Sequence, residues 1–332
     1  MKKTITITIA IISMLALAGC LKKNSFEGNE FLMGTVINVK IYNSSDAEQI
    51  AGNIFSGISE LEQTISWRIE DSPVAVLNRT GKISKKTFPE ADEIFSVTNN
   101  IYVDSEGKFD ITVGKLCVLW GIGTFDARVP ADDEVKDALK YVNGSAVVVT
   151  DSDIFIGDSQ FIDLGSVGKG YACDRAREIL EKSDTEGACI AVGGSILVYG
   201  RHNNKDTYTI AVRDPDGEIN DYIGTVEVTD CVVSTSGNYE HILESNGIKY
   251  HHILDTSTGY PVGFPGEPEL KSVTVICHDG ILSDALSSAC FAAGLEDGLK
   301  IARQYGAEAI FVTKDREIIT TGIKLDNQIS GR

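Results

Sequence analysis

Short runs of β-branched and aromatic residues, separated by turn residues, dominate the chain after residue 146, and this pattern limits the folds open to it. Helical segments interrupt these runs at 168–182, 284–293 and 296–305. Strands and helices therefore do not alternate regularly, as repeated βαβ units of a parallel sheet would require. The pattern predicts an α+β fold with mixed or antiparallel sheets and flanking helices. The expected strands are 146–150, 154–156, 161–163, 188–192, 196–199, 208–212, 223–228, 231–234, 249–254 and 271–277, with a last hairpin over 308–320.

The first half of the chain has more helical character. Residues 35–42 alternate in polarity and predict a strand. Residues 46–65 place five apolar side chains on one helical stripe, with Ser45 or Asp46 as the N-cap. Two more helices are expected, over 89–104 with its proline in the first turn and over 132–142.

The N-terminus has the form of a secretion signal. Lys2 and Lys3 precede a mostly apolar stretch over 5–18, which is too short to span a bilayer comfortably. The stretch ends in Leu-Ala-Gly-Cys20, which resembles a bacterial lipobox. Cys20 would then be the diacylated first residue of a lipoprotein. The alternative is an ordinary cleaved signal that a chance cysteine happens to follow.

The expected domain division follows from the lipoprotein assignment. Residues 1–19 form the signal peptide, 20–30 a lipid-anchored tether, and 31–332 one domain, because no clear linker divides the rest. The mature chain is expected on the extracytoplasmic face of the cell membrane.

The chain is strongly acidic, with a formal net charge of −18. This charge disfavours nucleic acid and anionic membrane surfaces as partners, since both are polyanions. An anionic substrate would need a local cation to hold it. The cysteines beyond Cys20 form no Cys-x-x-Cys pair and mostly lie among apolar residues, so we expect buried, reduced thiols.

Four polar, glycine-rich turns lie between apolar segments, at 107–121, 162–171, 233–239 and 251–261. Glycine lets the backbone approach a ligand closely. In the second turn a predicted strand ends at Asp163 and Lys169 opens a helix, an arrangement in which N–H groups can cradle a phosphate. Taken alone, this turn also fits a plain strand-to-helix connection with a solvated lysine.

Two further groups could act chemically. Asp284 and Ser288 are four residues apart at a helix start, so a carboxylate and a hydroxyl share one face and suit a hard cation such as Mg²⁺. Helix capping by Ser283 and Asp284 explains the same residues without a metal. His252 has the side chain best suited to general-base work near neutral pH, but on a strand His251 and His252 point to opposite faces.

Taken in order, these segments resemble the ApbE family of FAD:protein FMN transferases. The resemblance runs from Phe-Leu-Met-Gly-Thr35 to Ser-Asp-Ala-Leu-Ser-Ser-Ala289, nearly the whole mature chain. Each motif is weak by itself, and their joint order and spacing carry the resemblance. It implies an α+β fold with mixed sheets around a cleft for FAD.

The resemblance also implies roles for individual residues. It places Met33 and Trp67 beside the flavin ring. The implied oxygen ligands of Mg²⁺ are Ser166, Asp284 and Ser288. The residues implied to line the FAD cleft are Lys108, Phe109, Asp110, Asp163, Lys169, Thr235, Ser236, Gly237, His252 and Ile253.

The chain departs from the family pattern at several places. Ser288 stands where threonine is usual, which keeps the hydroxyl. Lys115 replaces a common proline and Ser195 a common aspartate. Thr256 and Ser257 replace a frequent Pro-Arg pair, which removes a cation near the cleft.

The resemblance implies Mg²⁺-dependent transfer of FMN from FAD to a Thr or Ser hydroxyl of an extracytoplasmic electron-transfer protein, with release of AMP. The acceptor segment is implied to contain Asp-x-x-Thr/Ser-Gly-Ala/Ser-Thr. In our hypothesis, His252 accepts the proton of that hydroxyl and Lys169 supplies the cation that the acidic chain needs. Two alternatives stay open: a FAD pyrophosphatase that uses water as the nucleophile, and a non-catalytic lipoprotein that captures flavin for a transporter.

Overall fold

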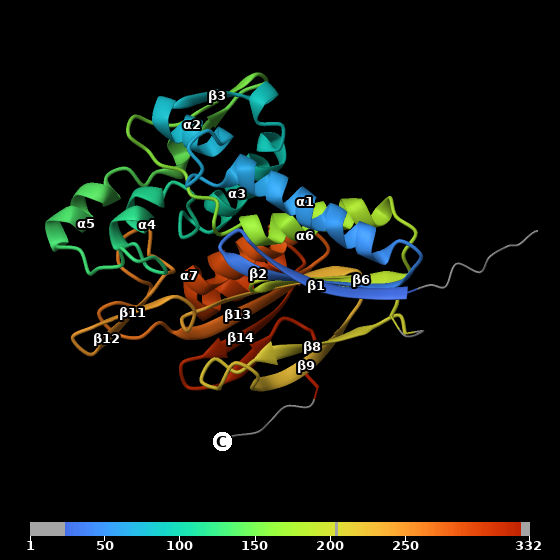
Figure 1. Cartoon of the computed structure of the whole chain (residues 1–332). Coiled ribbons are helices and arrows are strands. Elements are labelled where there is room, and N and C mark those ends of the chain that lie inside the picture. Colours follow the sequence, from blue (N-terminus) through green and yellow to red (C-terminus); the bar gives the residue numbers. More distant parts are fainter. Residues whose placement is uncertain (1–23, 203–204, 327–332) are drawn as a thin grey trace, which may run out of the picture.

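The computed structural model describes residues 24–202 and 205–326 (Figure 1). Its centre is an eight-stranded sheet of order β1-β2-β6-β7-β10-β13-β14-β15, in which every neighbouring pair is antiparallel. The expected α+β class is confirmed. The strands of this sheet are β1 (Asn24–Leu32), β2 (Thr35–Ser44), β6 (Gly187–Val192), β7 (Ser195–Gly200), β10 (Cys231–Gly237), β13 (Leu270–Cys277), β14 (Glu308–Thr313) and β15 (Ile318–Thr320).

The central strands of this sheet are buried on both faces, one face by three helices and the other by a hairpin (Figure 1). Side chains that alternate along a strand therefore enter two different cores. In β14, Ala309 and Phe311 join the helix-side core, while Ile310 and Val312 join the hairpin-side core. The covering elements are α1 (Ala47–Ile65), α6 (Gly168–Glu181), α7 (Gly280–Gln304), β8 (Tyr208–Arg213) and β9 (Tyr222–Val228).

Two smaller units border the main sheet. One contains a three-stranded sheet of order β3-β5-β4, and the other packs two helices against a hairpin around Trp120 and Tyr250. The first unit comprises α2 (Pro73–Thr80), β3 (Lys82–Ser84), α3 (Ala91–Asp104), β4 (Val148–Val149) and β5 (Asp153–Phe155), with 3₁₀ turns η1 (Lys85–Thr87) and η2 (Gly144–Ala146). The second comprises α4 (Gly114–Trp120), α5 (Asp132–Leu139), β11 (Ile242–Ser245) and β12 (Ile248–His251).

The helix predictions are largely confirmed. The bounds of α1, α5 and α6 lie within three residues of the expected ones. The two helices expected over 284–305 are one element, α7, interrupted at Gly294, where φ is 81° and only glycine is comfortable. In contrast, α3 begins at Ala91, so Pro89 precedes the helix. Asp46 is the N-cap residue of α1, but within the described chain its side chain makes no capping hydrogen bond.

Two expectations about extended segments are wrong. Residues 161–163 form no strand within the described chain; Phe161 makes only an isolated bridge to Val113. Residues 24–30 are not a tether, because they pair with β2 as part of β1 and Phe26 packs against the helix-side core. The sequence pattern also does not predict α2, α4 or β11, which are too short to show a clear periodicity.

The expected signal peptide over 1–19 and the lipidation site Cys20 lie outside the described residues. None of the described helices combines the length and apolar composition needed to cross a bilayer. The six cysteines of the described part are all free thiols.

Candidate active site

A long cleft opens between the main sheet and the smaller units. It consists of two adjoining cavities of about 290 and 380 Å³ that share part of their lining. We call the shared residues the seam. A ligand with two bulky ends and a charged middle suits two compartments that meet at a charged seam. The seam consists of Arg68, Ile122, Asp163, Gly165, Lys169, Glu240, His241 and His252.

The cleft brings together nearly all of the residues that the sequence singles out. The larger cavity adds Met33 and Trp67 to the seam. Gly237 lines neither cavity, because it is buried against the ring of Tyr239. Asp284 also lines neither and lies beneath the start of α6. The smaller cavity adds Lys108, Phe109, Asp110, Ser166, Thr235, Ser236, Ile253 and Ser288.

The turn between β1 and β2 places Met33 at the larger cavity. Met33 and Gly34 have φ of 54° and 71°, the positive values that two-residue hairpin turns of type I′ require. A Cβ on Gly168 would lie 3.2 Å from Met33 Cε, so glycine at the start of α6 leaves room for the methionine.

Asp163 orients an aromatic wall of the larger cavity. Trp67 Nε1 donates a hydrogen bond to Asp163 Oδ2 at 3.1 Å, and Gly165 N donates to Oδ1 at 2.8 Å. Trp67 stands edge-on to Phe161, and the Arg68 guanidinium lies 4.1 Å from the centroid of the Trp67 ring. Asp163 thus holds the indole that the resemblance places beside the flavin.

Lys169 brings positive charge to the seam from the second position of α6. Its stem passes the turn between β6 and β7, where a Cβ on Gly193 would lie 3.2 Å from Lys169 Cδ. Glycine at this position therefore makes room for the lysine. Asp163 and Glu240 carry negative charge at the same seam, so an anionic ligand there needs the cations of Lys169 and Arg68.

Asp284 joins α7 to the start of α6. Asp284 is only 3% exposed, and its Oδ2 accepts a hydrogen bond from Gly170 N at 2.9 Å. Burial raises the pKa of Asp284, while the charge of Lys169 and the Gly170 N–H oppose this effect. The carboxylate is thus held against the residue that follows Lys169.

Hydroxyl groups gather near Asp284, where Ser287 Oγ donates to the Asp284 carbonyl oxygen at 2.9 Å. Ser236 Oγ lies 3.1 Å from Ser288 Oγ and 2.8 Å from Ser287 Oγ. Among residues 24–202 and 205–326, no three His, Cys, Asp or Glu side chains are placed to hold a metal by themselves. Mg²⁺ commonly takes one or two carboxylates and completes its shell with water and substrate phosphates. The resemblance assigns this role to Asp284, Ser288 and Ser166. Ser288 and Ser166 line the smaller cavity, and Asp284 accepts from Gly170 N at the start of α6.

His252 lies at the seam with one ring nitrogen already engaged. Nδ1 is 3.1 Å from the carbonyl oxygen of Glu240, which can only accept, so Nδ1 carries the proton and Nε2 keeps its lone pair. Burial lowers the pKa of His252 to about 3, and Lys169 and His241 act in the same direction. The expected strand over 249–254 is shorter, because β12 ends at His251 and His252 lies just beyond it. The two side chains nevertheless lie apart: His251 Nε2 is 3.0 Å from Val262 O, and His251 lines neither cavity.

The depressed pKa of His252 predicts an acid-sensitive stability. The pKa of this histidine is 6.5 in the unfolded chain and about 3 in the folded protein, so unfolding between these pH values takes up a proton. Its stabilising contribution is therefore complete above pH 6.5 and is lost as the pH falls towards 3. When the pH is lowered from about 7 to about 5, the unfolding free energy of His252→Gln should fall by roughly 2 kcal/mol less than that of the wild type. Urea unfolding at both values measures the difference, and equal losses would contradict a buried neutral imidazole.

Asp110 faces the smaller cavity, but its carboxylate is used within the protein. Oδ1 accepts hydrogen bonds from Thr112 N at 2.8 Å and Thr112 Oγ1 at 2.7 Å, and Oδ2 accepts one from Gly144 N at 2.7 Å. Asp110 therefore fixes the turn that presents Lys108 and Phe109.

Four residues of the seam do not emerge from the sequence: Arg68, Ile122, Glu240 and His241. Arg68 follows Trp67 directly, Ile122 follows the first glycine-rich turn, and Glu240 and His241 continue the third. Extending these three segments by one or two residues would include all four. Arg68 also supplies a cation to the cleft.

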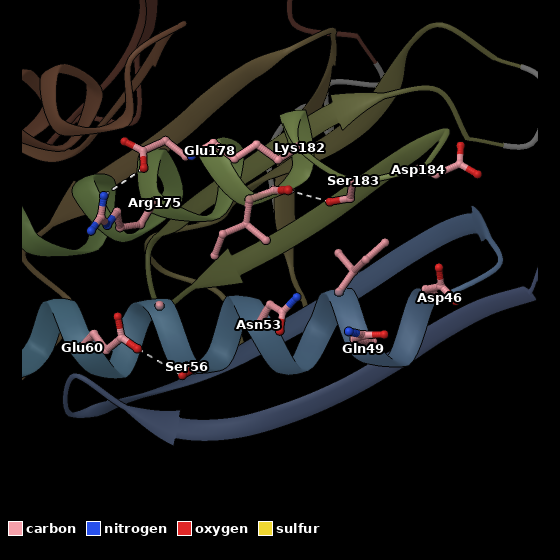
Figure 2. Close-up of a pocket in the computed structure, with 13 residues that line it drawn as sticks. Asp46, Gln49, Asn53, Ser56, Glu60, Arg175, Glu178, Lys182, Ser183 and Asp184 are labelled. Carbon is pink, nitrogen blue, oxygen red and sulfur yellow. Dashed lines mark hydrogen bonds and ion pairs between the residues drawn. The ribbon is translucent and has the colours of Figure 1, made fainter.

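Another hollow, of about 680 Å³, lies between α1 and α6 (Figure 2). Several of its polar side chains pair with each other, as Arg175 does with Glu178 at 2.8 Å and Ser56 with Glu60 at 3.4 Å. It shares no lining residue with the cleft. We assign the candidate active site to the cleft, where the charged and aromatic groups converge.

The fold and the cleft define an α+β protein with a two-compartment cleft that carries charged groups where the compartments adjoin. The model of the ApbE family matches residues 33–311, and the chain belongs to that family. A relative from Klebsiella pneumoniae named FAD:protein FMN transferase is 30% identical over 297 residues, covering 87% of this chain and 89% of the relative. A protein of the same name from Treponema pallidum is 27% identical over 312 residues, covering 87% and 84%.

Solved structures agree with this membership. The ApbE protein of Thermotoga maritima superposes with a TM-score of 0.81 at 30% identity, covering 92% of this chain and 97% of that one. The flavinyl transferase ApbE of Pseudomonas stutzeri gives a TM-score of 0.77 at 25% identity, covering 92% and 96%.

Proposed function

We propose that this protein transfers FMN from FAD to a Thr or Ser hydroxyl of an acceptor protein, in a Mg²⁺-dependent reaction that releases AMP. The observation that carries the proposal is the junction of two cavities at Lys169, directly beside the buried Asp284. FAD has this form, since a diphosphate joins its flavin and adenosine ends. The names of the curated relatives supply the direction of the reaction.

In the proposed complex, the flavin occupies the larger cavity beside Met33 and Trp67. The adenosine end occupies the smaller cavity beside Phe109. Lys169 and Arg68 hold the diphosphate at the seam. Mg²⁺ held by Asp284, Ser288 and Ser166 would neutralise charge on the diphosphate and make AMP a better leaving group.

His252 is the general base for the acceptor hydroxyl. Its Nε2 accepts the proton of the acceptor hydroxyl while the hydroxyl oxygen forms a bond to the FMN-side phosphorus. The bond from that phosphorus to the bridging oxygen breaks, and AMP leaves with this oxygen. The negative phosphates beside the imidazole counteract burial and raise its pKa in the complex. The product is FMN joined to the acceptor through a phosphoester.

The proposed location is the extracytoplasmic face of the cell membrane, with a lipid anchor at Cys20 and acceptors in electron-transfer proteins. The support is the lysine pair, the apolar stretch and the Leu-Ala-Gly-Cys sequence at the N-terminus.

The decisive experiment combines the purified protein, FAD, Mg²⁺ and an acceptor that contains Asp-x-x-Thr/Ser-Gly-Ala/Ser-Thr. Mass spectrometry is expected to find the acceptor heavier by FMN less one water, and an acceptor with valine in place of the motif hydroxyl residue should stay unmodified. Free FMN and AMP without any acceptor would instead indicate a pyrophosphatase. FAD bound but unchanged would indicate a non-catalytic flavin-binding protein.

We expect Lys169→Ala to raise the KM for FAD by roughly tenfold to a hundredfold, because a hydrogen bond to a charged group contributes about 1.5–3 kcal/mol. Steady-state kinetics at saturating Mg²⁺ measures this change. Lys182→Ala is the matched control, since Lys182 follows the other end of α6 and faces the hollow of Figure 2. An unchanged KM in Lys169→Ala would contradict the proposed diphosphate position.

A further inference from the structure

The long helix α7, which carries Asp284 and Ser288, is capped from outside. The first N–H groups of a helix have no partner within it. Within the described chain, the N-cap residue Asp279 makes no capping hydrogen bond with its side chain, which instead contacts His278 Nδ1 at 3.0 Å. The cap comes from α6: Asp174 Oδ1 accepts from Gly280 N at 2.6 Å and Oδ2 accepts from Ile281 N at 2.7 Å.

A second residue of α6 holds the same turn. Arg177 lies three residues after Asp174, on the same helical face, and its Nη2 donates to the carbonyl oxygen of His278 at 2.9 Å. Arg177 is 7% exposed. Asp174 therefore binds N–H groups of the helix start while Arg177 binds a carbonyl just before it. The two side chains form a clamp on the segment that leads into α7.

The two helix starts also touch through their backbones. A Cβ on Gly170 would lie 2.0 Å from Gly280 O, and a Cβ on Gly280 would lie 2.2 Å from Gly170 O. No side chain fits between them. Gly170 N also donates to Asp284 Oδ2. The place of Asp284 relative to Lys169 thus depends on how the start of α7 sits on α6.

We propose that Asp174 and Arg177 are positioning residues that hold the start of α7 against α6, so that Asp284 keeps its place beside Lys169. This inference rests on the proposed function, in which Asp284 and Lys169 act on the diphosphate. Small displacements of a positioned group carry large kinetic costs, because the reacting geometry tolerates little error. Asp174 touches neither cavity and acts only through the helix that it caps.

A helix cap that served stability alone would behave differently. Its loss would lower the melting temperature and leave the cation dependence of the folded enzyme unchanged. Loss of a positioning clamp should instead weaken the cation site in enzyme that remains folded. The experiment therefore has to measure cation affinity, local backbone protection and melting temperature in the same variants.

The test compares wild type with Asp174→Ala, Asp174→Asn and Glu178→Ala, all as full chains at about pH 8, well above the pKa of about 6 to which burial raises Asp174. Glu178 is the matched control, because it lies on α6 but faces the hollow of Figure 2 and pairs with Arg175. Asp174→Asn retains one acceptor oxygen, so its effect should lie between those of wild type and Asp174→Ala. If Asp174→Ala does not fold, the Asp174→Asn variant tests the positioning role.

We expect the Mg²⁺ concentration for half-maximal stabilisation of the FAD complex, followed by thermal shift, to rise about tenfold to a hundredfold in Asp174→Ala. Hydrogen exchange at the start of α7 should accelerate in the same variant, and Glu178→Ala should match wild type in both measurements. An Asp174→Ala variant that melts earlier with an unchanged Mg²⁺ dependence would overturn the positioning role. A wild type without any Mg²⁺ effect or transfer would instead overturn the proposed function.

Discussion

Replacing His252 with glutamine is expected to lower kcat for FMN transfer by about 10²–10⁴, the usual contribution of a positioned general base. Glutamine can still donate a hydrogen bond to Glu240 O, so it should keep the local structure while it removes the basic lone pair of Nε2. The KM for FAD should change little, because His252 acts on the hydroxyl of the acceptor protein and not on FAD. Single-turnover transfer to a saturating acceptor separates the chemical step from binding.

His251→Gln is the control for this prediction. His251 precedes His252, but its side chain bonds Val262 O and stacks edge-on against Phe291, away from the cleft. Its kcat per folded molecule should stay close to wild type. If His252→Gln transferred FMN as fast as His251→Gln, another group would have to accept the proton.

Replacing Asp284 with asparagine is expected to reduce metal-dependent transfer by at least about a hundredfold, since a bound cation contributes several kcal/mol to stabilising charge in the transition state. Asparagine keeps an oxygen that can accept from Gly170 N, so the melting temperature should change little. Asp284→Ala should abolish transfer as well, but it leaves a buried N–H without its partner and should be destabilised by about 1–3 kcal/mol.

The two Asp284 variants together separate charge from packing. Transfer rates over a range of Mg²⁺ concentrations, with circular dichroism melts of each variant, make the comparison. Normal turnover in Asp284→Asn would defeat the assignment of a metal to this position. A loss of activity in Asp284→Ala alone would show that Asp284 matters for packing and not for charge.

The structure explains which expectations from the sequence fail. The helix over 46–65 is predicted closely because a stripe of apolar residues repeats with the helical period over many turns. Residues 161–163 are apolar at two positions but lack a long strand partner. Residues 24–30 join the sheet through backbone pairing with β2, which depends on main-chain groups and leaves little trace in polarity.

Some residues of the candidate site can be recognised in the sequence, and others only in the structure. Glycine-rich turns around Lys169 and His252 are visible in the sequence, because a turn or a close backbone approach needs particular residues locally. Arg68 and Glu240 have ordinary sequence surroundings and become notable only when the fold brings them to the seam. Asp174 looks like any charged residue of a helix until its carboxylate meets the N–H groups of Gly280 and Ile281.

The sequence by itself determines the fold class, most helix positions and the order of the chemistry-bearing turns, since these depend on periodicity and on residues within a few positions of each other. Only the tertiary structure decides that Gly170 N meets Asp284, 114 residues away, and that two cavities join at Lys169. The physical reason is that hydrogen bonds and burial between distant segments exist only after the sheet has aligned α6 with α7.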